Sequence, residues 1–213
     1  MKKFAFTLAE VLITLGIIGI VAAMTIPALM NSNNDAQTRT GVKEAYAILS
    51  QAMTMAASDN GGTIKGLCGD WDNICFKNLI KPALSYTKEC DNTPVTNGCW
   101  ATMKHYDNTA YNANGYPAIV LKNGMLVLFR YHSQNCTYVD ATSTNYTCGW
   151  VMVDINGLKN PNAVGKDTFY FHTQDGKFLP AGIAGDTGNF LNCTGTETGA
   201  YSGWACASKY LNN

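Results

Sequence analysis

The first part of the chain is almost entirely apolar. Residues 11 to 23 include no charged side chain, and residues 6 to 29 would span about 36 Å as an α-helix. That length crosses the hydrocarbon core of a bilayer, and Lys2 and Lys3 would keep the start of the helix in the cytoplasm. We therefore predict a transmembrane helix at residues 6–29, with the rest of the chain outside the cytoplasm.

A second apolar pattern follows a polar break at residues 31–35. Its members recur at helical spacing, and they are Val42, Ala45, Tyr46, Leu49, Ala52, Met53 and Ala56. The pattern predicts that residues 30–58 continue the same helix in amphipathic form and pack one face on a globular head at residues 59–213. The run from Asp59 to Gly62 suits a helix end, because glycine adopts positive φ at little cost.

Strand patterns dominate the second half of the head. Asn123-Gly124 separates two apolar runs at residues 118–121 and 125–131, which is a strong hairpin signal. Further strands are expected at residues 150–154 and 169–173, and Asp175-Gly176 is expected to turn the chain after the last of them. The predicted fold class is α+β and pilin-like, with an antiparallel sheet packed on the long helix.

Residues 63–116 have weak periodicity and many Asn, Thr and Gly residues. We expect loops there, with one short helix near residues 79–84 that stops close to Pro82.

Eight cysteines indicate an oxidising compartment. They fall into close pairs along the chain: Cys68 and Cys75, Cys90 and Cys99, Cys136 and Cys148, Cys193 and Cys206. No Cys-x-x-Cys occurs, and no histidine lies at ligand spacing from a cysteine, so disulfides are favoured over zinc. Pairing of nearest neighbours loses the least chain entropy, although the sequence leaves the other pairings open.

The charge balance and the absence of catalytic motifs narrow the range of possible functions. Fifteen basic residues balance fifteen acidic ones and no basic run is present, so the chain has no evident footprint for nucleic acid. It contains no Gly-x-Ser-x-Gly, no His-Glu-x-x-His and no phosphate-binding glycine loop. We therefore expect a protein that is not an enzyme and that needs no organic cofactor.

Glu10 is the unusual residue of the apolar segment. A carboxylate near the middle of a membrane costs about 2.5–3.5 kcal/mol on insertion scales, so its presence needs a reason. An ordinary secretory signal peptide would not supply one, and the apolar run continues past Pro27 without a convincing cleavage site. A tolerated acid close to the cytoplasmic headgroups is the simpler alternative.

The surrounding residues supply a reason by resemblance. The run Lys3-Phe4-Ala5-Phe6-Thr7-Leu8-Ala9-Glu10-Val11-Leu12-Ile13 resembles the prepilin processing motif of type IV pilins and type II secretion pseudopilins. The resemblance implies that residues 1–5 are a leader, that prepilin peptidase cuts between Ala5 and Phe6, and that Phe6 is then methylated. Glu10 becomes the fifth mature residue and the partner of a neighbouring Phe6 amine. The family usually has glycine where this chain has Ala5.

The same resemblance implies a life cycle. The subunit would cross the inner membrane once, with its head outside the cytoplasm, and would then join copies of itself and other pilins or pseudopilins in a fibre. A monomeric binding module held by an uncleaved signal anchor, such as an adhesin, is the alternative. The sequence leaves open whether the fibre is a surface pilus or a secretion or DNA-uptake pseudopilus, because the terminal cysteine loop favours the pilus and residues 154–167 favour the pseudopilus.

Residues 154–167 resemble the Asp/Asn/Gly-rich connection of secretion-type pseudopilins, some of which hold calcium. Asp154, Asn156 and Asp167 offer the oxygen ligands that calcium prefers. The alternative is a loop built from turns in which Asn and Asp side chains bond their own backbone.

Overall fold

The computed structural model describes residues 7–139, 144–186, 193–199 and 201–212. The chain divides into two compact units, residues 1–37 and residues 38–213. The predicted α+β class is confirmed, with a long N-terminal helix, an antiparallel sheet and disulfide-closed loops.

Helix α1 spans Leu8–Asp59, and Pro27 lies inside it. Its segment Leu8–Pro27 is long and apolar enough to cross a membrane, with a mean hydropathy of 2.2. The helix ends at the predicted place. The N–H of Gly62 donates to the carbonyl of Ala57 at 2.7 Å, and Gly61 and Gly62 both have positive φ, which closes the last turn.

Six strands form the main sheet in the order β1-β4-β5-β6-β7-β8, and every neighbouring pair is antiparallel. The strands are β1 (Tyr86–Cys90), β4 (Ala118–Leu121), β5 (Leu126–Tyr131), β6 (Gly149–Asp154), β7 (Thr168–Gln174) and β8 (Lys177–Pro180). A small second sheet pairs β2 (Met103–Lys104) with β3 (Ala110–Tyr111). The predicted hairpin and the predicted strands β6 and β7 are all present.

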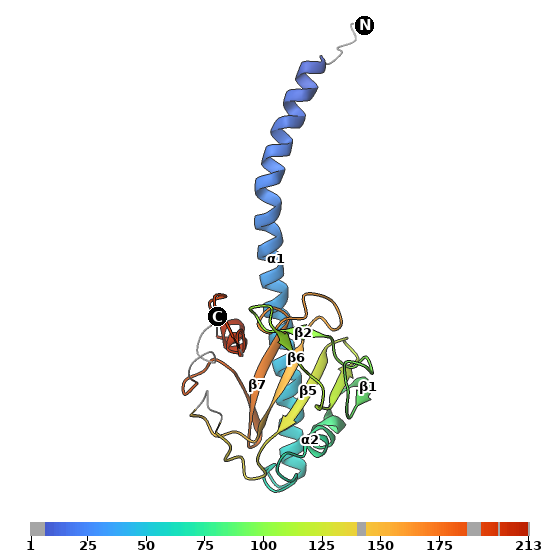
Figure 1. Ribbon diagram of the computed structural model, residues 1–213, viewed down its shortest axis with the longest axis vertical. Helices are drawn as coiled ribbons and strands as arrows, with labels where there is room; N and C mark the ends of the chain where they lie inside the picture. Colours follow the sequence, from blue (N-terminus) through green and yellow to red (C-terminus); the bar gives the residue numbers. More distant parts are fainter. Residues whose placement is uncertain (1–6, 140–143, 187–192, 200, 213) are drawn as a thin grey trace. The chain divides into compact units, whose positions relative to one another are not determined.

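The core of the head lies between the sheet and the part of α1 that belongs to the head unit (Figure 1). Val127 and Phe129 of β5 point to the helix, whereas Leu126 and Leu128 belong to a second cluster on the other face of the sheet. This is the alternation expected of a strand that is covered on both sides. The predicted apolar stripe of the helix is confirmed, since Val42, Ala45, Leu49, Ala52, Met53 and Ala56 are buried, while Tyr46 is half-buried.

Gly41 lets a loop approach α1 closely. A Cβ atom at this position would lie 2.9 Å from Cδ1 of Ile155, the first residue after β6. The absence of a side chain at Gly41 therefore allows the β6–β7 connection to seat on the helix.

The segment expected to be mostly loop contains more regular structure than the pattern indicated. Helix α2 runs Asn73–Ile80 and passes into a 3₁₀ turn at Lys81–Ala83, so the predicted short helix is real but begins earlier. Asp72 starts it by accepting a hydrogen bond from the N–H of Cys75 at 2.9 Å. Strands β1 and β8 and the C-terminal helix α3 (Cys206–Leu211) were not predicted.

A buried lysine explains how the polar strand β1 is held. The ammonium group of Lys77, on α2, is almost fully buried and pairs with Glu89 at 3.0 Å and with Asp91. Lys81 reaches the same Glu89 carboxylate at 3.0 Å. Because Glu89 is on β1, these ion pairs fasten β1 to the helix beside it.

Candidate functional site

The beginning of α1 carries its apolar side chains on the outside. The large apolar residues of the stretch from Leu8 to Leu29 are 43–79% exposed, and they occur on all sides of the helix rather than in one stripe. A helix of this kind needs an apolar surrounding, either lipid or other helices. The first unit by itself does not provide one.

Glu10 lies within the first turn of this apolar helix. Its carboxylate Oε2 accepts hydrogen bonds from the N–H and the hydroxyl of Thr7, each at 2.8 Å, and its own N–H donates to the Thr7 hydroxyl at 3.2 Å. This reciprocal pair is a capping box, which satisfies two backbone groups at the start of a helix. The spacing Thr-x-x-Glu signals it in the sequence, and our sequence analysis did not use that signal.

The capping box supplies no cation for the charge of Glu10. None of the lysine, arginine or histidine side chains in the part of the chain that the structure describes forms an ion pair with it. Both Ala5 and Phe6, where processing is predicted, lie outside the described residues. Cleavage at that bond and methylation of Phe6 stay predictions.

The predicted calcium ligands come together in space. Asp154 ends β6, Asp167 precedes β7, and both are buried. Asp167 accepts hydrogen bonds from the N–H groups of Asn162 and Ala163 at 2.7 Å each and from the amide of Asn156 at 3.2 Å. Asp154 accepts from the N–H of Asn156 at 3.2 Å. The three predicted residues therefore form one cluster.

Burial shifts the protonation of both carboxylates in this cluster. Burial, and then the negative charge of Asp167, raise the pKa of Asp154 to about 8. Burial also raises the pKa of Asp167, against the hydrogen bonds from Ala163 and Asn162. A cation between them would remove the repulsion that opposes their ionisation.

Two side-chain amide oxygens of the same loop are also relevant. The side-chain carbonyls of Asn156 and Asn162 are buried and accept no hydrogen bond from the described residues. Asn162 was missed by the sequence analysis, because only the folded loop brings it to Asp167. An all-oxygen set of this kind fits calcium rather than zinc. However, no group of three or more His, Cys, Asp or Glu side chains gathers for a metal within the described ranges. Calcium binding by Asp154, Asn156 and Asp167 therefore stays a prediction.

All four disulfides join nearest neighbours along the chain. Each closes a short loop, and such a closure stabilises a fold by about 2–3 kcal/mol, mainly by restricting the unfolded chain. Cys193–Cys206 fastens the C-terminal loop to α3, and Cys68–Cys75 closes the loop that leads into α2. The expectation of disulfides is confirmed, and the structure selects the pairing that the sequence left open.

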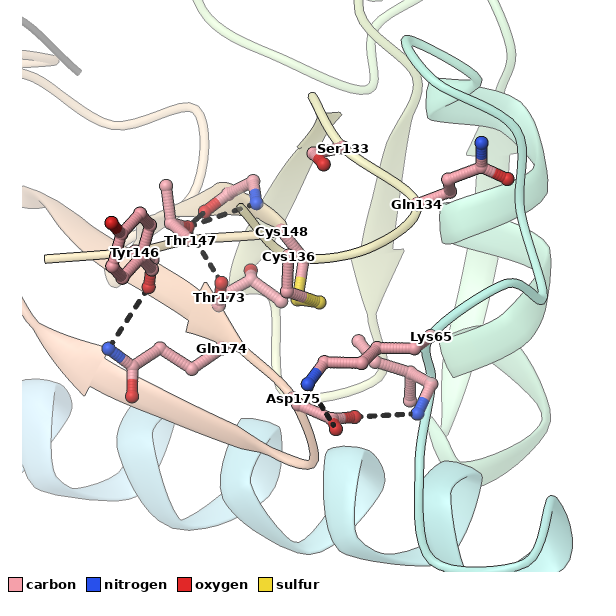
Figure 2. Close-up of a disulfide and its surroundings, with 12 residues drawn as sticks. Lys65, Ser133, Gln134, Cys136, Tyr146, Thr147, Cys148, Thr173, Gln174 and Asp175 are labelled. Carbon is pink, nitrogen blue, oxygen red and sulfur yellow. Dashed lines mark hydrogen bonds and ion pairs between the residues drawn. A yellow bond between two sulfur atoms is a disulfide. The ribbon is translucent and has the colours of Figure 1, made fainter. Parts of the chain in front are cut away.

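The surroundings of Cys136–Cys148 show how such a loop is fixed (Figure 2). The hydroxyl of Thr147 donates to the carbonyl of Thr173 at 2.6 Å, and the amide of Gln174 donates to the carbonyl of Tyr146 at 3.2 Å. Both bonds tie the segment before β6 to β7. Cys148 therefore lies in a segment that is bonded to the sheet.

His172 has a structural environment. Its Nε2 lies 3.2 Å from Oδ2 of the buried Asp186, and the same carboxylate oxygen accepts the N–H of Gly182 at 2.8 Å. The pair joins β7 to the segment that follows β8.

The chain was compared with known proteins in three ways. Neither the protein-family models, nor the curated proteins, nor the solved structures include a match to the chain. The function has to be argued from the apolar helix with Glu10 and from the disulfide-closed head.

Proposed function

We propose that this chain is a pilin-like subunit without catalytic activity, cleaved between Ala5 and Phe6, methylated at Phe6 and assembled with its copies into a type IV pilus or a type II secretion pseudopilus. The head is held outside the cytoplasm by the helix, first in the inner membrane and then in the fibre. The observation that carries the proposal is the Glu10 carboxylate, which pairs with no cation among the described residues and stands on a stretch of α1 whose large apolar side chains are exposed on every side.

The chemistry of Glu10 supports assembly rather than simple anchoring. An anchor would gain from Glu10 only the capping of its first turn, whereas the charge costs insertion free energy. The hydrogen bonds from Thr7 offset only a part of that cost, since neither donor carries a positive charge. Cleavage before Phe6 would create a new ammonium group, and in a bundle of such helices this ammonium on one subunit and Glu10 on the next would each supply the counter-ion that the other lacks.

The head supports an extracytoplasmic location. Its four disulfides require an oxidising compartment, which is the side of the membrane to which the lysines near the start would direct it. Prepilin peptidase would be the first partner, and other pilins or pseudopilins would be the later ones.

Mass spectrometry of the chain extracted from membranes tests the proposal. We expect a mature N-terminus at Phe6 that carries one methyl group. Ala5→Gly should be cut at least as efficiently, because glycine is the residue that the family usually has there, and Ala5→Lys should block cleavage. A mature chain that starts at Met1, or near Met24, would contradict the proposal.

The alternative is a monomeric binding module on an uncleaved anchor. One observation favours it, namely the exposed Trp71 on a disulfide-closed loop of the head. The same mass measurement separates the two functions, because the anchored module keeps Met1 and the fibre subunit loses it.

A further inference from the structure

The head unit has two ends along the axis of α1. At one of them, here called the near end, α1 enters the head at Thr38, and at the other, called the far end, α1 stops at Asp59 (Figure 1). The helix rises about 24 Å between Lys43 and Asp59. The two ends are therefore separate surfaces of the head.

The far end is assembled from three segments. Residues 59–75 lead from α1 into α2, and the segments 133–137 and 174–177 are bonded to them. One of these bonds joins the carboxylate of Asp175 to the N–H of Ile64 at 2.8 Å. The three segments therefore form one continuous surface.

The charged side chains of the far end are mostly acidic. Lys65 forms an ion pair with Asp175 at 3.4 Å (Figure 2), so these two charges offset each other. The other charged side chains in the three segments are all exposed, and they are Asp59, Asp70, Asp72 and Lys177. Because three acids stand against one base, the far end carries a net negative charge.

The near end is assembled from four elements. The first is the start of α1 within the head. The turn between β4 and β5 reaches this helix through Asn123, whose side-chain amide donates to the carboxylate of Glu44 at 2.9 Å. The connection between β6 and β7 seats on Gly41, and the end of α3 shares a groove with Lys43.

Basic side chains dominate the near end. Its exposed acid is Glu44, whereas Asp154 and Asp167 are buried. Apart from Lys166, which lies over the Tyr106 ring, the basic side chains of the four elements are Arg39, Lys43, Lys122, Lys159 and Lys209. The other charges nearby, on the side of β2, balance one another, and they are Lys104, Lys166, Asp107 and Glu197. The near end therefore carries a net positive charge, opposite to that of the far end.

Both ends also expose apolar side chains next to their charges. At the far end, Leu67, Trp71 and Ile74 are 38%, 54% and 37% exposed. At the near end, Leu158 is 58% exposed and directly precedes Lys159. Exposed ion pairs alone contribute little to binding, and the burial of such apolar surface would add to them.

The loop that carries Trp71 is fixed before any partner binds. The Cys68–Cys75 disulfide closes it. The carboxylate of Asp70 accepts the N–H of Gln134 at 2.7 Å. In addition, the amide oxygen of Asn73 accepts the N–H of Tyr131 at 2.8 Å. A surface of this kind loses little conformational freedom when it is covered.

The opposite charges of the two ends indicate which surface covers the far end. Two far ends would repel each other, because their acids would meet. A far end placed against a near end brings opposite charges together, and it leaves one end of each copy open for a further copy. Copies that enter a membrane in the same orientation are parallel, so a neighbour displaced along the helix axis brings these two ends together.

We propose that the far end of one head binds the near end of the next copy of this chain, with the exposed aspartates of one facing the exposed lysines of the other. This contact rests on the proposed fibre function and names the surface through which the heads of successive subunits meet. Because the contact joins two different surfaces, it repeats without closing on itself, as a fibre requires.

Photochemical capture tests the contact in the full-length chain. Benzoylphenylalanine, a photoreactive aromatic residue, is placed at position 71 on the far end, and membranes of the producing cells are irradiated. We expect dimers and higher multiples of the chain. Mass spectrometry of the captured peptides should locate the new bond at the near end, in residues 38–44, 122–124 or 155–161. Capture should weaken when the salt concentration is raised from about 0.1 M to about 1 M, because exposed charges are then screened.

Reversal of the charges supplies the matched variants. Lys43→Glu with Lys159→Glu should lower the capture at least about tenfold, because acids then face acids, and Asp59→Lys with Asp70→Lys should do the same from the other side. A chain that carries all four substitutions should recover most of the capture, which a misfolded head would not. Lys88→Glu, on the exposed part of β1, reverses a charge away from both ends and should have no effect.

Three results would overturn the proposal. They are the absence of captured copies or a bond outside the near end, undiminished capture after reversal of one end, and no recovery in the chain with all four substitutions. The proposed fibre function is judged separately by the mass of the N-terminus. A chain that begins at methylated Phe6 but shows no capture between the ends would refute this contact alone.

Discussion

The two parts of helix α1 use the same kind of residue in opposite ways. Leu12, in the first unit, is 61% exposed, whereas Leu49, in the head unit, is 1% exposed. The difference lies in where the matching apolar surface is found. The sheet of the same chain covers Leu49, whereas the described part of the first unit leaves most of Leu12 exposed. An apolar residue thus reports either the fold of its own chain or the environment that the chain has to enter.

The acidic residues of the two units also differ in their surroundings. In the first unit Glu10 stands on an apolar surface and accepts hydrogen bonds from Thr7, and in the head Asp154 and Asp167 are buried together among backbone N–H groups. Each carboxylate is hydrogen-bonded, and none of the three pairs with a cation among the described residues. Under the proposed function, the counter-ion of Glu10 would come from a neighbouring subunit. A bound calcium ion, if the prediction holds, would serve the same purpose for Asp154 and Asp167.

The largest expected effect concerns Glu10. Glu10→Gln keeps the shape of the side chain and removes the charge, which leaves a neighbouring Phe6 ammonium unpaired in an apolar bundle. We expect fibre formation to fall by about a hundredfold or more, because breaking one partner of a buried ion pair costs about 3–5 kcal/mol. The yield of sheared fibres measures it, and Glu44→Gln, an exposed acid on the head part of α1, is the control. Normal fibres from Glu10→Gln would refute the role of the acid in assembly.

The next effect tests the comparison of the two leucines directly. Leu49→Ala should lower the free energy of unfolding of the head by about 2–5 kcal/mol, because it leaves a cavity between helix and sheet. Leu12→Ala should change it by less than about 0.5 kcal/mol. Thermal melting of the two variants, followed by near-ultraviolet circular dichroism, gives both numbers. Equal destabilisation would mean that the first unit is part of the folding unit of the head.

A smaller effect is expected from calcium. If Asp154, Asn156 and Asp167 hold the ion, calcium at a hundred times its dissociation constant should stabilise the head by about 2.7 kcal/mol. The melting temperature should therefore fall when a chelator is added and recover with excess calcium. Asp154→Asn should abolish that response, whereas Asp70→Asn should retain it. If the chelator leaves the melting temperature of the wild-type chain unchanged, the cluster does not bind calcium. It is then a loop built from Asn and Asp turns.

The smallest effect is a loosening of the C-terminal loop in acid. The hydroxyl and N–H of Thr109 and the N–H of Gly199 donate to Asp107 and lower its pKa to about 2. Its folded pKa is thus below the ordinary value of 3.8, so this stabilisation is present above pH 3.8 and is lost as the pH falls through about 2. The protection of the Gly199 amide, which is its exchange rate relative to that of a free peptide, should therefore fall over that interval. Asp107→Ala, which removes both acceptor oxygens, should lack this protection at every pH, and full protection in that variant would dismiss the bond.

Prediction succeeded where the pattern is local. The helix end at Asp59, the hairpin at Asn123-Gly124 and the strands at residues 150–154 and 169–173 all follow from neighbours in the sequence. Prediction failed where the formation of an element depends on a segment far away in the sequence. Strand β1 reads Tyr-Thr-Lys-Glu-Cys, which is too polar to suggest a strand, and it pairs because β4 and the buried Lys77 lie beside it.

The sequence by itself determined the long apolar helix, the position of Glu10, the amphipathic stripe beyond it and the expectation of disulfides, because each depends on the type and spacing of residues along the chain. Only the tertiary structure decided which cysteines pair, that Asn162 joins Asp154 and Asp167, and that Trp71 stays exposed on a rigid loop. Those features depend on contacts between segments far apart in the sequence. The physical reason is that hydrophobic spacing encodes which face of an element is buried, but not which other segment will bury it.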